Sequence, residues 1–504
     1  MFVISRNKQL NLLFNIIGIM VTMNVILSNK FVKFYIGRFI FKQFIKLHEK
    51  QIDNTDSSKP KPLSSNKFIR SLCFNEERLN MLPHTKIGTI ITFSKLRQVM
   101  LLQIIGNYFP NSSLQIMDED KYNDDMLNMK FTVMKHSKEG DELYWFEQFL
   151  DIIGRQIIEW DELESHYCIS TKGLSKHEIK PGYAKLDTQM IFEKKGPLNK
   201  MILVNIVING ETRNIDDGFA IRHCMTAIFT KLSIKQHLIG THMMMASGIN
   251  CIIESKLTND HPIRRLLGMY SISPYFANEV STVSLLGKTG LSLNFGFTHR
   301  GLFDYISISK EMFNIRKEFY RPSQNTADNI YLDMWWNELY KLCSEFIDLN
   351  LDQDSFTYKS EFIIDLKNMY GENVFLGSKS ITDNLKDICA MTLYSAVMHE
   401  LYSNPQIISL CSNPFIISTG WRENNSSCLS DKINKVSEQL SFNIIGAGTA
   451  YEAKRMDNDW TDYAINESEQ TIFVNFQNSL KKLAKVIPLN AVLHPNNVSS
   501  SISY

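Results

Sequence analysis

A long, mostly apolar stretch runs from Lys231 to Leu267, and its pattern predicts one long helix followed by a turn at His261. The predicted helix carries His237 and His242, which are five residues apart. In a straight α-helix each residue advances by about 100°, so these two side chains would point about 140° away from each other. A π-turn instead places positions i and i+5 on one face, and such turns occur mostly at functional sites. The spacing predicts a pair of histidines if a π-turn is present, and two unrelated histidines if it is not.

The hydrophobic pattern divides the whole chain into four parts. Residues 1–50 are an apolar run followed by a basic, amphipathic segment, and residues 51–67 are a polar linker rich in serine and proline. Residues 68–178 repeat apolar positions at spacings of three and four, which predicts a helical subdomain. Residues 179–504 are the largest part, and we expect one large domain there.

The N-terminal segment has the features of a membrane-associating element. Its uncharged run, Gln9–Asn29, is long enough to cross a bilayer core of about 30 Å. A retained anchor, a cleaved signal peptide and a buried or interfacial helix all fit this run, which is interrupted by Asn11, Asn15 and Asn24 and shows no A-x-A cleavage site. The segment Lys30–Lys50 has the spacing of a helix on a membrane surface, or of an amphipathic helix packed on the domain. We therefore expect membrane association through the N-terminus, or entry into the secretory pathway.

Within residues 179–504 the pattern changes from β-like to helical. The run Ile202–Ile208, ILVNIVI, precedes Asn209-Gly210 and predicts a strand or a hairpin. Helices are then predicted where apolar residues recur at spacings of three and four, namely at Asp333–Leu349, Tyr358–Tyr370, Asn384–Tyr402 and Val474–Ile487. The predicted fold class is mainly α, with a small β element.

Composition narrows the classes of function. The 504 residues include 54 Lys and Arg against 53 Asp and Glu, so no overall field steers the chain toward nucleic acid. The eight cysteines show no CxxC spacing, which argues against a zinc knuckle and leaves disulfides undetermined. The hydrophobic content of 44% is that of a globular protein with a substantial core.

Three of the twelve histidines stand in apolar helices: His237, His242 and His399. A buried imidazole must be hydrogen-bonded or coordinated, and neutral imidazoles suit iron, zinc or copper. The dipeptide His399-Glu400 resembles the start of the H-E-x-x-H zinc motif, but Ser403 breaks that motif. Asn404 follows His399 by five residues and so repeats the spacing of the first pair.

At this point the sequence resembles the lipoxygenase family of non-haem iron fatty-acid dioxygenases. HLIGTH at His237–His242, followed by an apolar helix and HPIRRLL at His261–Leu267, is similar to the family's H-x4-H helix and its downstream H-P-I-x-K-L-L segment. Weaker similarities follow in the family's order at Asp333–Leu349, Cys389–Asn404 and Phe473–Ile487, with a tail ending in SSSISY. The resemblance covers roughly residues 182–504 and lacks the family's N-terminal β-barrel domain.

The resemblance implies a set of metal ligands. His237, His242 and His399 match the three histidine ligands, and either Asn404 or Ser403 matches the next position. The carboxylate of Tyr504, where the family usually ends in Ile, matches the last ligand. The implied cofactor is non-haem iron, with manganese accepted by the same ligands.

The resemblance also implies a reaction and its partners. The enzyme would remove a bis-allylic hydrogen from a polyunsaturated fatty acid and add dioxygen to give a hydroperoxide. Arg264 and Arg265 are candidates to bind the substrate carboxylate. Five apolar residues could line a substrate cavity, although each is more simply explained as core: Met243, Met244, Met245, Ile252 and Leu266.

Two other hypotheses stay open from the sequence. One is an iron oxygenase with the lipoxygenase fold and a different substrate. The other is a non-catalytic, membrane-anchored binding protein in which His237 and His242 are core residues. A straight helix that points the two rings apart would favour the latter.

Overall fold

The computed structural model describes residues 142–196, 200–258, 260–270, 295–321, 330–352, 355–357, 359–404, 407, 410, 416–423, 455–489, 491–500 and 502. The predicted N-terminal segment 1–50, the linker 51–67 and residues 68–141 of the predicted helical subdomain lie outside these residues. Within the described part of the chain, no helix is both long enough and apolar enough to cross a membrane.

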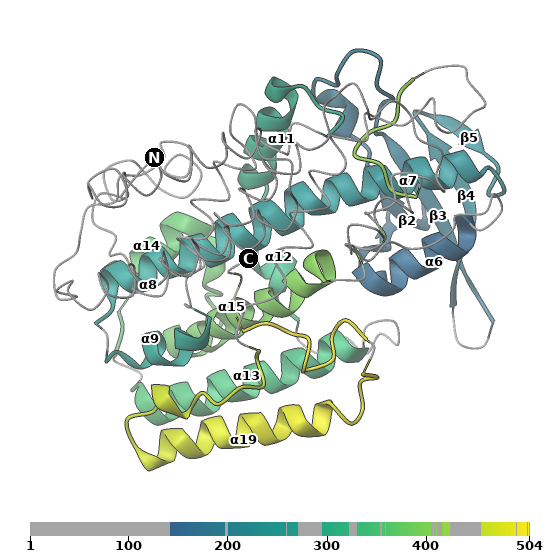
Figure 1. Cartoon of the computed structure of the whole chain (residues 1–504). Coiled ribbons are helices and arrows are strands. Elements are labelled where there is room, and N and C mark those ends of the chain that lie inside the picture. Colours follow the sequence, from purple (N-terminus) through teal and green to yellow (C-terminus); the bar gives the residue numbers. More distant parts are fainter. Residues whose placement is uncertain are drawn as a thin grey trace, which may run out of the picture.

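A long helical rod runs through the middle of the molecule (Figure 1). It consists of α7 (Gly218–Lys231), the π-helical segment η5 (Leu232–Ile249) and α8 (Asn250–Lys256), which follow one another directly. Asp217 begins the rod, because its carboxylate accepts the N–H of Ala220 at the N-cap. Most side chains of η5 are buried, as expected of a helix that is apolar on every face. The structure thus confirms the predicted long helix.

A five-stranded antiparallel sheet lies at one end of the rod (Figure 1), in the order β1-β2-β3-β4-β5. The turn between β4 and β5 is Asn209-Gly210, with φ of 51° and 86°, and it confirms the predicted hairpin. Both residues need a positive φ, which Asn and Gly adopt most readily. The strands are β1 (Glu159–Asp161), β2 (His166–Ser170), β3 (Thr188–Lys195), β4 (Lys200–Ile208) and β5 (Glu211–Arg213).

Residues 142–178, the described part of the predicted helical subdomain 68–178, are not all helical. Glu142–Ile153 is helical and forms α6, but residues 159–161 and 166–170 are strands. β2 pairs with β3 from Tyr167 opposite Phe192 to Ser170 opposite Gln189. Such short strands depend on a partner strand that local periodicity does not reveal.

Further helices build the body around the rod. Four of them, α13, α14, α15 and α19, confirm the four predicted helices, with ends displaced by a few residues. The helices are α9 (Pro262–Leu266), α11 (His299–Glu311), α12 (Ile315–Phe319), α13 (Ile330–Asn350), α14 (Glu361–Tyr370), α15 (Ile381–Ser403) and α19 (Glu467–Leu483). Single 3-10 turns are η3 (Arg155–Ile157), η4 (Leu174–Lys176), η6 (Leu267–Met269), η9 (Glu372–Val374) and η10 (Thr461–Tyr463).

Helix α15 is the centre of the core. It packs against η5 on one side and α13 on the other, and α19 covers α13 (Figure 1). Every residue of α15 from Asn384 to Ser403 is buried. The carboxylate of Asp387 is paired inside this core with Arg316 at 2.9 Å and Lys379 at 2.8 Å. A buried carboxylate needs such partners to remain charged.

The chain after α19 returns to the core as an extended tail. Trp335 Nε1 donates to the carbonyl oxygen of Leu493 at 2.8 Å, which holds the tail on α13. Farther along, Ser499, Ser500 and Ile502 are fully buried. The tail therefore carries the last described residues into the interior.

Candidate metal centre

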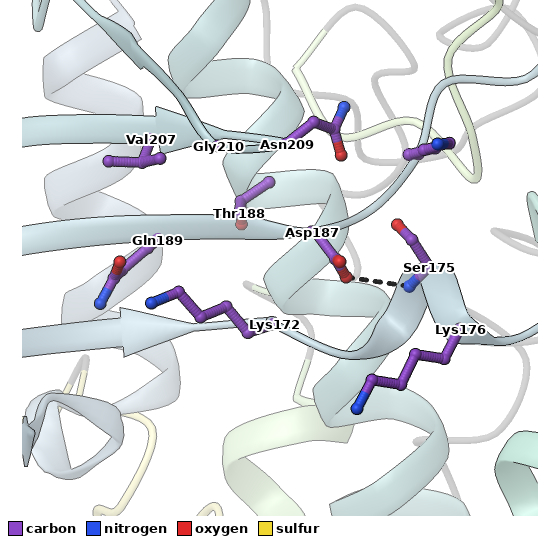
Figure 2. A pocket seen from close by; sticks show the side chains of 10 residues that line it. Lys172, Ser175, Lys176, Asp187, Thr188, Gln189, Val207, Asn209 and Gly210 are labelled. Atoms are coloured by element: carbon purple, nitrogen blue, oxygen red, sulfur yellow. Dashed lines mark hydrogen bonds between the residues drawn. The ribbon is translucent and has the colours of Figure 1, made fainter. Parts of the chain in front are cut away.

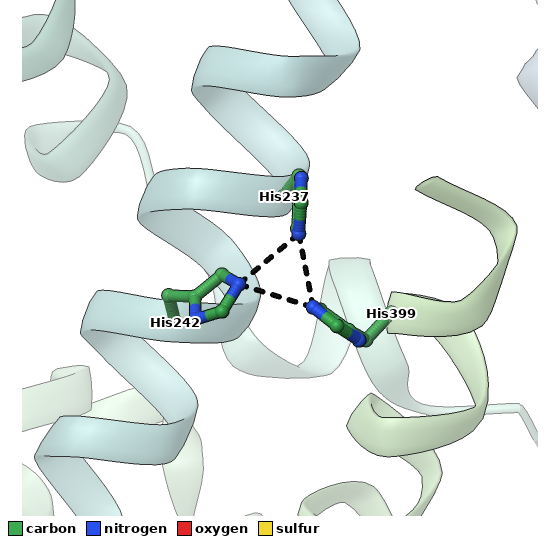
Figure 3. Close-up of side chains that lie close together, drawn as sticks. All are labelled: His237, His242 and His399. Carbon is green, nitrogen blue, oxygen red and sulfur yellow. Dashed lines mark hydrogen bonds between the residues drawn. The ribbon is translucent and has the colours of Figure 1, made fainter. Parts of the chain in front are cut away.

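Three histidine rings meet between η5 and α15 (Figure 3). The Nε2 atoms of His237 and His399 lie 2.9 Å apart, and each lies 3.0 Å from Nε2 of His242. His399 is fully buried, His242 is 7% exposed and His237 is partly exposed. The structure thus brings together the three histidines predicted as ligands, in a group able to hold a metal ion.

The wide turns of η5 put His237 and His242 on one face of the rod. Their ring centroids are 4.8 Å apart, which a straight α-helix cannot achieve at a spacing of five. The π-turn that this spacing requires is present, and it is longer than a single turn, because η5 spans Leu232–Ile249. Long π-helical stretches are rare, and π-turns occur mostly at functional sites.

Hydroxyl groups support the wide helix at both histidines. Thr241 Oγ1 donates to the carbonyl oxygen of His237 at 2.6 Å, and Ser247 Oγ donates to that of His242 at 3.0 Å. These bonds satisfy carbonyl oxygens next to the rings and stabilise the local backbone. The sequence predicted no role for either hydroxyl, although both lie four or five residues after a histidine.

Ser403 orients the third histidine from behind. Its Oγ lies 3.0 Å from Nδ1 of His399 and 3.0 Å from the carbonyl oxygen of the same residue. The single hydroxyl proton can be donated to the carbonyl oxygen while Oγ accepts the N–H of Nδ1. That tautomer leaves the lone pair of Nε2 facing the other two rings, as in metal sites whose ligands are held by outer partners. Ser403 is thus on the side of the ring away from the cluster.

The three nitrogens fit a metal ion with an open, octahedral arrangement. With bonds of about 2.1 Å, two nitrogens at right angles lie about 3.0 Å apart, whereas nitrogens at a tetrahedral angle lie about 3.4 Å apart. The observed separations of 2.9 and 3.0 Å match the right-angle arrangement. Three neutral imidazoles on one face of an octahedron leave positions for further ligands, which suits non-haem iron and also manganese.

Asn404 and Tyr504 differ from the histidines in what the structure shows. α15 keeps its α-helical form up to Ser403, so Asn404 and His399 are not brought to one face as the first pair is. The side chain of Asn404 instead donates to the carbonyl oxygen of Glu400 at 2.7 Å and accepts the N–H of Ile407 at 2.9 Å. Tyr504 lies outside the described residues, so its role as a ligand stays a prediction.

Glu400 has a role that the sequence did not predict, because its carboxylate binds the tail of the chain. Glu400, the residue after His399, is buried, and its Oε1 accepts the backbone N–H of Ser499 at 2.9 Å. The resulting link joins the ligand helix to the last residues of the chain. No sequence signal could have found it, because the two residues are 99 positions apart.

The two arginines predicted to bind a substrate carboxylate both have partners within the protein. Arg265 is buried and forms a two-pronged ion pair with the carboxylate of Glu469 on α19. Arg264 Nη1 donates to the carbonyl oxygen of Leu257 at 2.8 Å. His261 also has a local role, because its Nδ1 accepts the N–H of Ile263 and caps α9. The carboxylate that Arg265 binds in this structure is thus that of Glu469.

The surroundings of the cluster are apolar and aromatic. The ring of Tyr402 lies 6.3 Å from that of His237, and its hydroxyl donates to Gln236 Oε1. Burial raises the pKa of Tyr402 well above its ordinary value, so the phenol stays neutral. The predicted wall or core residues are all buried within two hydrophobic clusters: Met243, Met244, Met245, Ile252 and Leu266.

A separate surface cavity of about 450 Å³ lies at the edge of the sheet (Figure 2). Three lysines, Lys172, Lys176 and Lys185, line it together with Asp187, which accepts the N–H of Ser175 at 2.9 Å. None of the three clustered histidines lines this cavity.

Comparison of the sequence with family models and with curated proteins finds no match. Solved structures do match. A coral 8R-lipoxygenase has a TM-score of 0.65 and 13% identity over 95% of this chain and 82% of its own. A lipoxygenase in complex with arachidonate has a TM-score of 0.65 and 12% identity, over 94% of this chain and 82% of its own. A 9R-lipoxygenase from Cyanothece PCC8801 has a TM-score of 0.63 and 13% identity, over 84% of this chain and 73% of its own. The chain therefore has a lipoxygenase-like fold.

Proposed function

We propose that this chain is a divergent member of the lipoxygenase family that uses non-haem iron to oxygenate a polyunsaturated fatty acid. One observation carries the proposal: the Nε2 atoms of His237, His242 and His399 converge at 2.9 and 3.0 Å in a lipoxygenase-like fold. The π-helical geometry that joins the first two removes the main reason to regard them as core residues.

The three histidines would hold the metal, and the C-terminal carboxylate of Tyr504 would complete its ligands. Support for the last ligand comes from the tail, in which Val498, Ser499 and Ser500 are buried and the N–H of Ser499 is bonded to Glu400. Iron, or manganese, would supply the one-electron chemistry for removing a hydrogen atom from a weak C–H bond. Ser403 keeps the His399 ring in the tautomer that such a ligand needs.

The substrate class follows from the chemistry and from the apolar surroundings. A bis-allylic C–H bond is weak enough for hydrogen-atom removal, and dioxygen addition then gives a hydroperoxide. The buried methionines of η5 and the neutral phenol of Tyr402 belong to the same two helices as the rings and would contribute an apolar lining for such a substrate. The solved relative in complex with arachidonate supports a fatty acid as the ligand class. Membrane association through residues 1–50 remains part of the proposal.

Metal analysis of the purified full chain tests the site. We expect about one iron or manganese ion per chain, and loss of that ion in His237→Ala and in His399→Ala. His299→Ala is the matched control, because His299 is exposed on α11 and stacks on Phe303. If the two cluster variants keep the metal content of the wild type, the ligand assignment is wrong.

Oxygen uptake with a panel of polyunsaturated fatty acids tests the reaction. We expect uptake together with conjugated-diene absorbance in the wild type and in His299→Ala, and neither signal in His399→Ala. A wild-type protein that holds iron but consumes no oxygen with any fatty acid would contradict the substrate class. It would favour an oxygenase with a different substrate on the same fold.

A further inference from the structure

We propose a second metal site in this chain, a zinc site on the β1–β2 hairpin formed by Asp161, His166 and Cys168. The ligand atoms of the three residues lie within 4.8 Å of one another. The site lies on the sheet, whereas the histidine cluster lies between η5 and α15. It does not depend on the proposed dioxygenase function.

The register of the hairpin brings the three side chains to one face. Asp161 on β1 lies directly opposite His166 on β2. Cys168 is two residues farther along β2, and alternate residues of a strand share a face. Side chains directly opposite one another have Cβ atoms about 5 Å apart, which is close enough for a shared ligand.

Asp161 is held in position for coordination, whereas Cys168 would have to release its proton on binding zinc, because burial raises the pKa of its thiol. Asp161 Oδ1 accepts the N–H groups of Leu163 and Glu164 at 3.0 and 3.1 Å, which fixes the carboxylate and leaves its second oxygen for an ion. Cys168 is 4% exposed and is a free thiol. His166 is partly buried beside it. A fixed carboxylate, an imidazole and a thiol form a donor set that zinc prefers.

The amide of Gln189 already behaves as a substitute for a cation at this position. Its Nε2 lies 3.0 Å from Nε2 of His166 and 3.3 Å from Oε2 of Glu164. Gln189 is 3% exposed. The two amide protons can satisfy Glu164 and, in the tautomer that carries its proton on Nδ1, the Nε2 lone pair of His166. A bound cation would take the place of this donor beside His166.

Charge and access also fit a divalent cation. Four carboxylates lie at the hairpin, those of Glu159, Asp161, Glu162 and Glu164, and Lys172 pairs with Glu164 at 2.5 Å. Gln189 and Lys172 border the surface cavity at the edge of the sheet (Figure 2), which gives an ion an entry path. Binding zinc requires the ligand atoms to move together by about 1 Å, because ligands around a tetrahedral ion lie about 3.3 to 3.8 Å apart.

The site has a structural purpose. β1 is only three residues long and forms the edge of the sheet, next to an exposed turn at Leu163. So short an edge hairpin is marginally stable without an additional constraint. A metal that joins β1 to β2 would fix this edge, as structural zinc does in small domains.

Cobalt substitution of the full chain tests the proposal. We expect a thiolate-to-cobalt absorption band in the near ultraviolet for the wild type, since the histidine cluster supplies no thiolate. The band should disappear in Cys168→Ala and persist in Cys343→Ala, which removes another buried free thiol. Absence of the band from the wild type, or its persistence in Cys168→Ala, would overturn the proposal.

Zinc content gives a second readout that does not require removal of a buried side chain. Asp161→Asn keeps an oxygen that accepts the two backbone N–H groups but removes the anionic ligand, so it should fold. We expect its zinc affinity to fall at least about tenfold, with iron at the histidine cluster unchanged. Unchanged zinc affinity in Asp161→Asn would also refute the site. His399→Ala should lose iron but keep the zinc affinity of the hairpin site. A failure of one site can therefore be told from a failure of the other.

Discussion

Glu400 Oε1 accepts the backbone N–H of Ser499 at 2.9 Å, and both residues are buried. Because Glu400 directly follows His399, this bond joins the helix of the third histidine to the tail that leads to Tyr504. The bond therefore links the ligand helix directly to the buried end of the described tail. The tail and the ligand helix should respond together when Glu400 is replaced.

Replacement of Glu400 tests this coupling. Glu400→Ala leaves the buried N–H of Ser499 without this acceptor, which should lower the free energy of unfolding by about 1 to 3 kcal/mol. We expect weaker metal binding as well, measured by metal analysis after dialysis. Glu400→Gln retains an acceptor oxygen and should remain close to the wild type. Equal metal retention in Glu400→Ala and the wild type would show that the tail is positioned by other contacts.

Ser403 should act on the metal through His399. Ser403→Ala removes the partner of Nδ1, so the ring loses its preferred tautomer, and metal affinity should fall about 10-fold to 100-fold. Ser403→Thr restores the hydroxyl and should recover most of the affinity. Competition with a chelator measures the affinity, and thermal unfolding shows whether the fold is kept. Similar affinity in Ser403→Ala and Ser403→Thr would exclude the positioning role.

Gly301 on α11 allows a close backbone contact that no other residue can make. A Cβ at this position would lie 2.1 Å from the carbonyl oxygen of Glu178, and that atom belongs to the backbone. Gly301→Ala should therefore destabilise the protein by more than about 1 kcal/mol, although alanine normally stabilises a helix. Gly377→Ala is the control, because nothing lies within 4 Å of its Cβ. Chemical denaturation of Gly301→Ala, Gly377→Ala and the wild type measures the free energies of unfolding, and equal values for the two variants would contradict the prediction.

The ion pair between Arg265 and Glu469 should be structural. Arg265→Ala leaves the buried carboxylate of Glu469 without its guanidinium partner and should cost about 3 to 5 kcal/mol of unfolding free energy. The double variant Arg265→Met with Glu469→Leu should regain much of that loss. If Arg265→Ala instead leaves stability unchanged and raises KM for a fatty acid, Arg265 binds the substrate as the sequence suggested.

His223 should make stability depend on pH. Burial lowers the pKa of His223 from 6.5 to about 4, although its bond to the carbonyl oxygen of Lys185 opposes the shift. Between these pH values the unfolded chain binds a proton that the native state does not, so stability falls as the pH falls. Relative to neutral pH, His223 lowers the free energy of unfolding by about 2 kcal/mol at pH 5 and by about 3 kcal/mol near pH 4. In His223→Gln the decrease in unfolding free energy between pH 7.5 and pH 5 should be smaller by about that amount. An equal decrease in the wild type and in His223→Gln would contradict this role of His223.

Much of the helical fold is readable from local sequence. The apolar periodicity of α13, α15 and α19 and the Asn-Gly turn after β4 are local signals, and the structure confirms the elements that they predict. Strands β1 and β2 were missed, because a strand of three to five residues is stabilised by its neighbour in the sheet.

The candidate site was likewise determined partly by the sequence and partly by the tertiary structure. The five-residue spacing of His237 and His242 determined that the two rings share a face only in a π-helix, because that follows from rotation per residue alone. Only the tertiary structure decided that η5 is π-helical, that α15 brings His399 within 3.0 Å, and that Ser403 lies behind its ring. The meeting of His399 with the other two rings depends on the packing of η5 against α15, because His242 and His399 are 157 residues apart and no local pattern relates them.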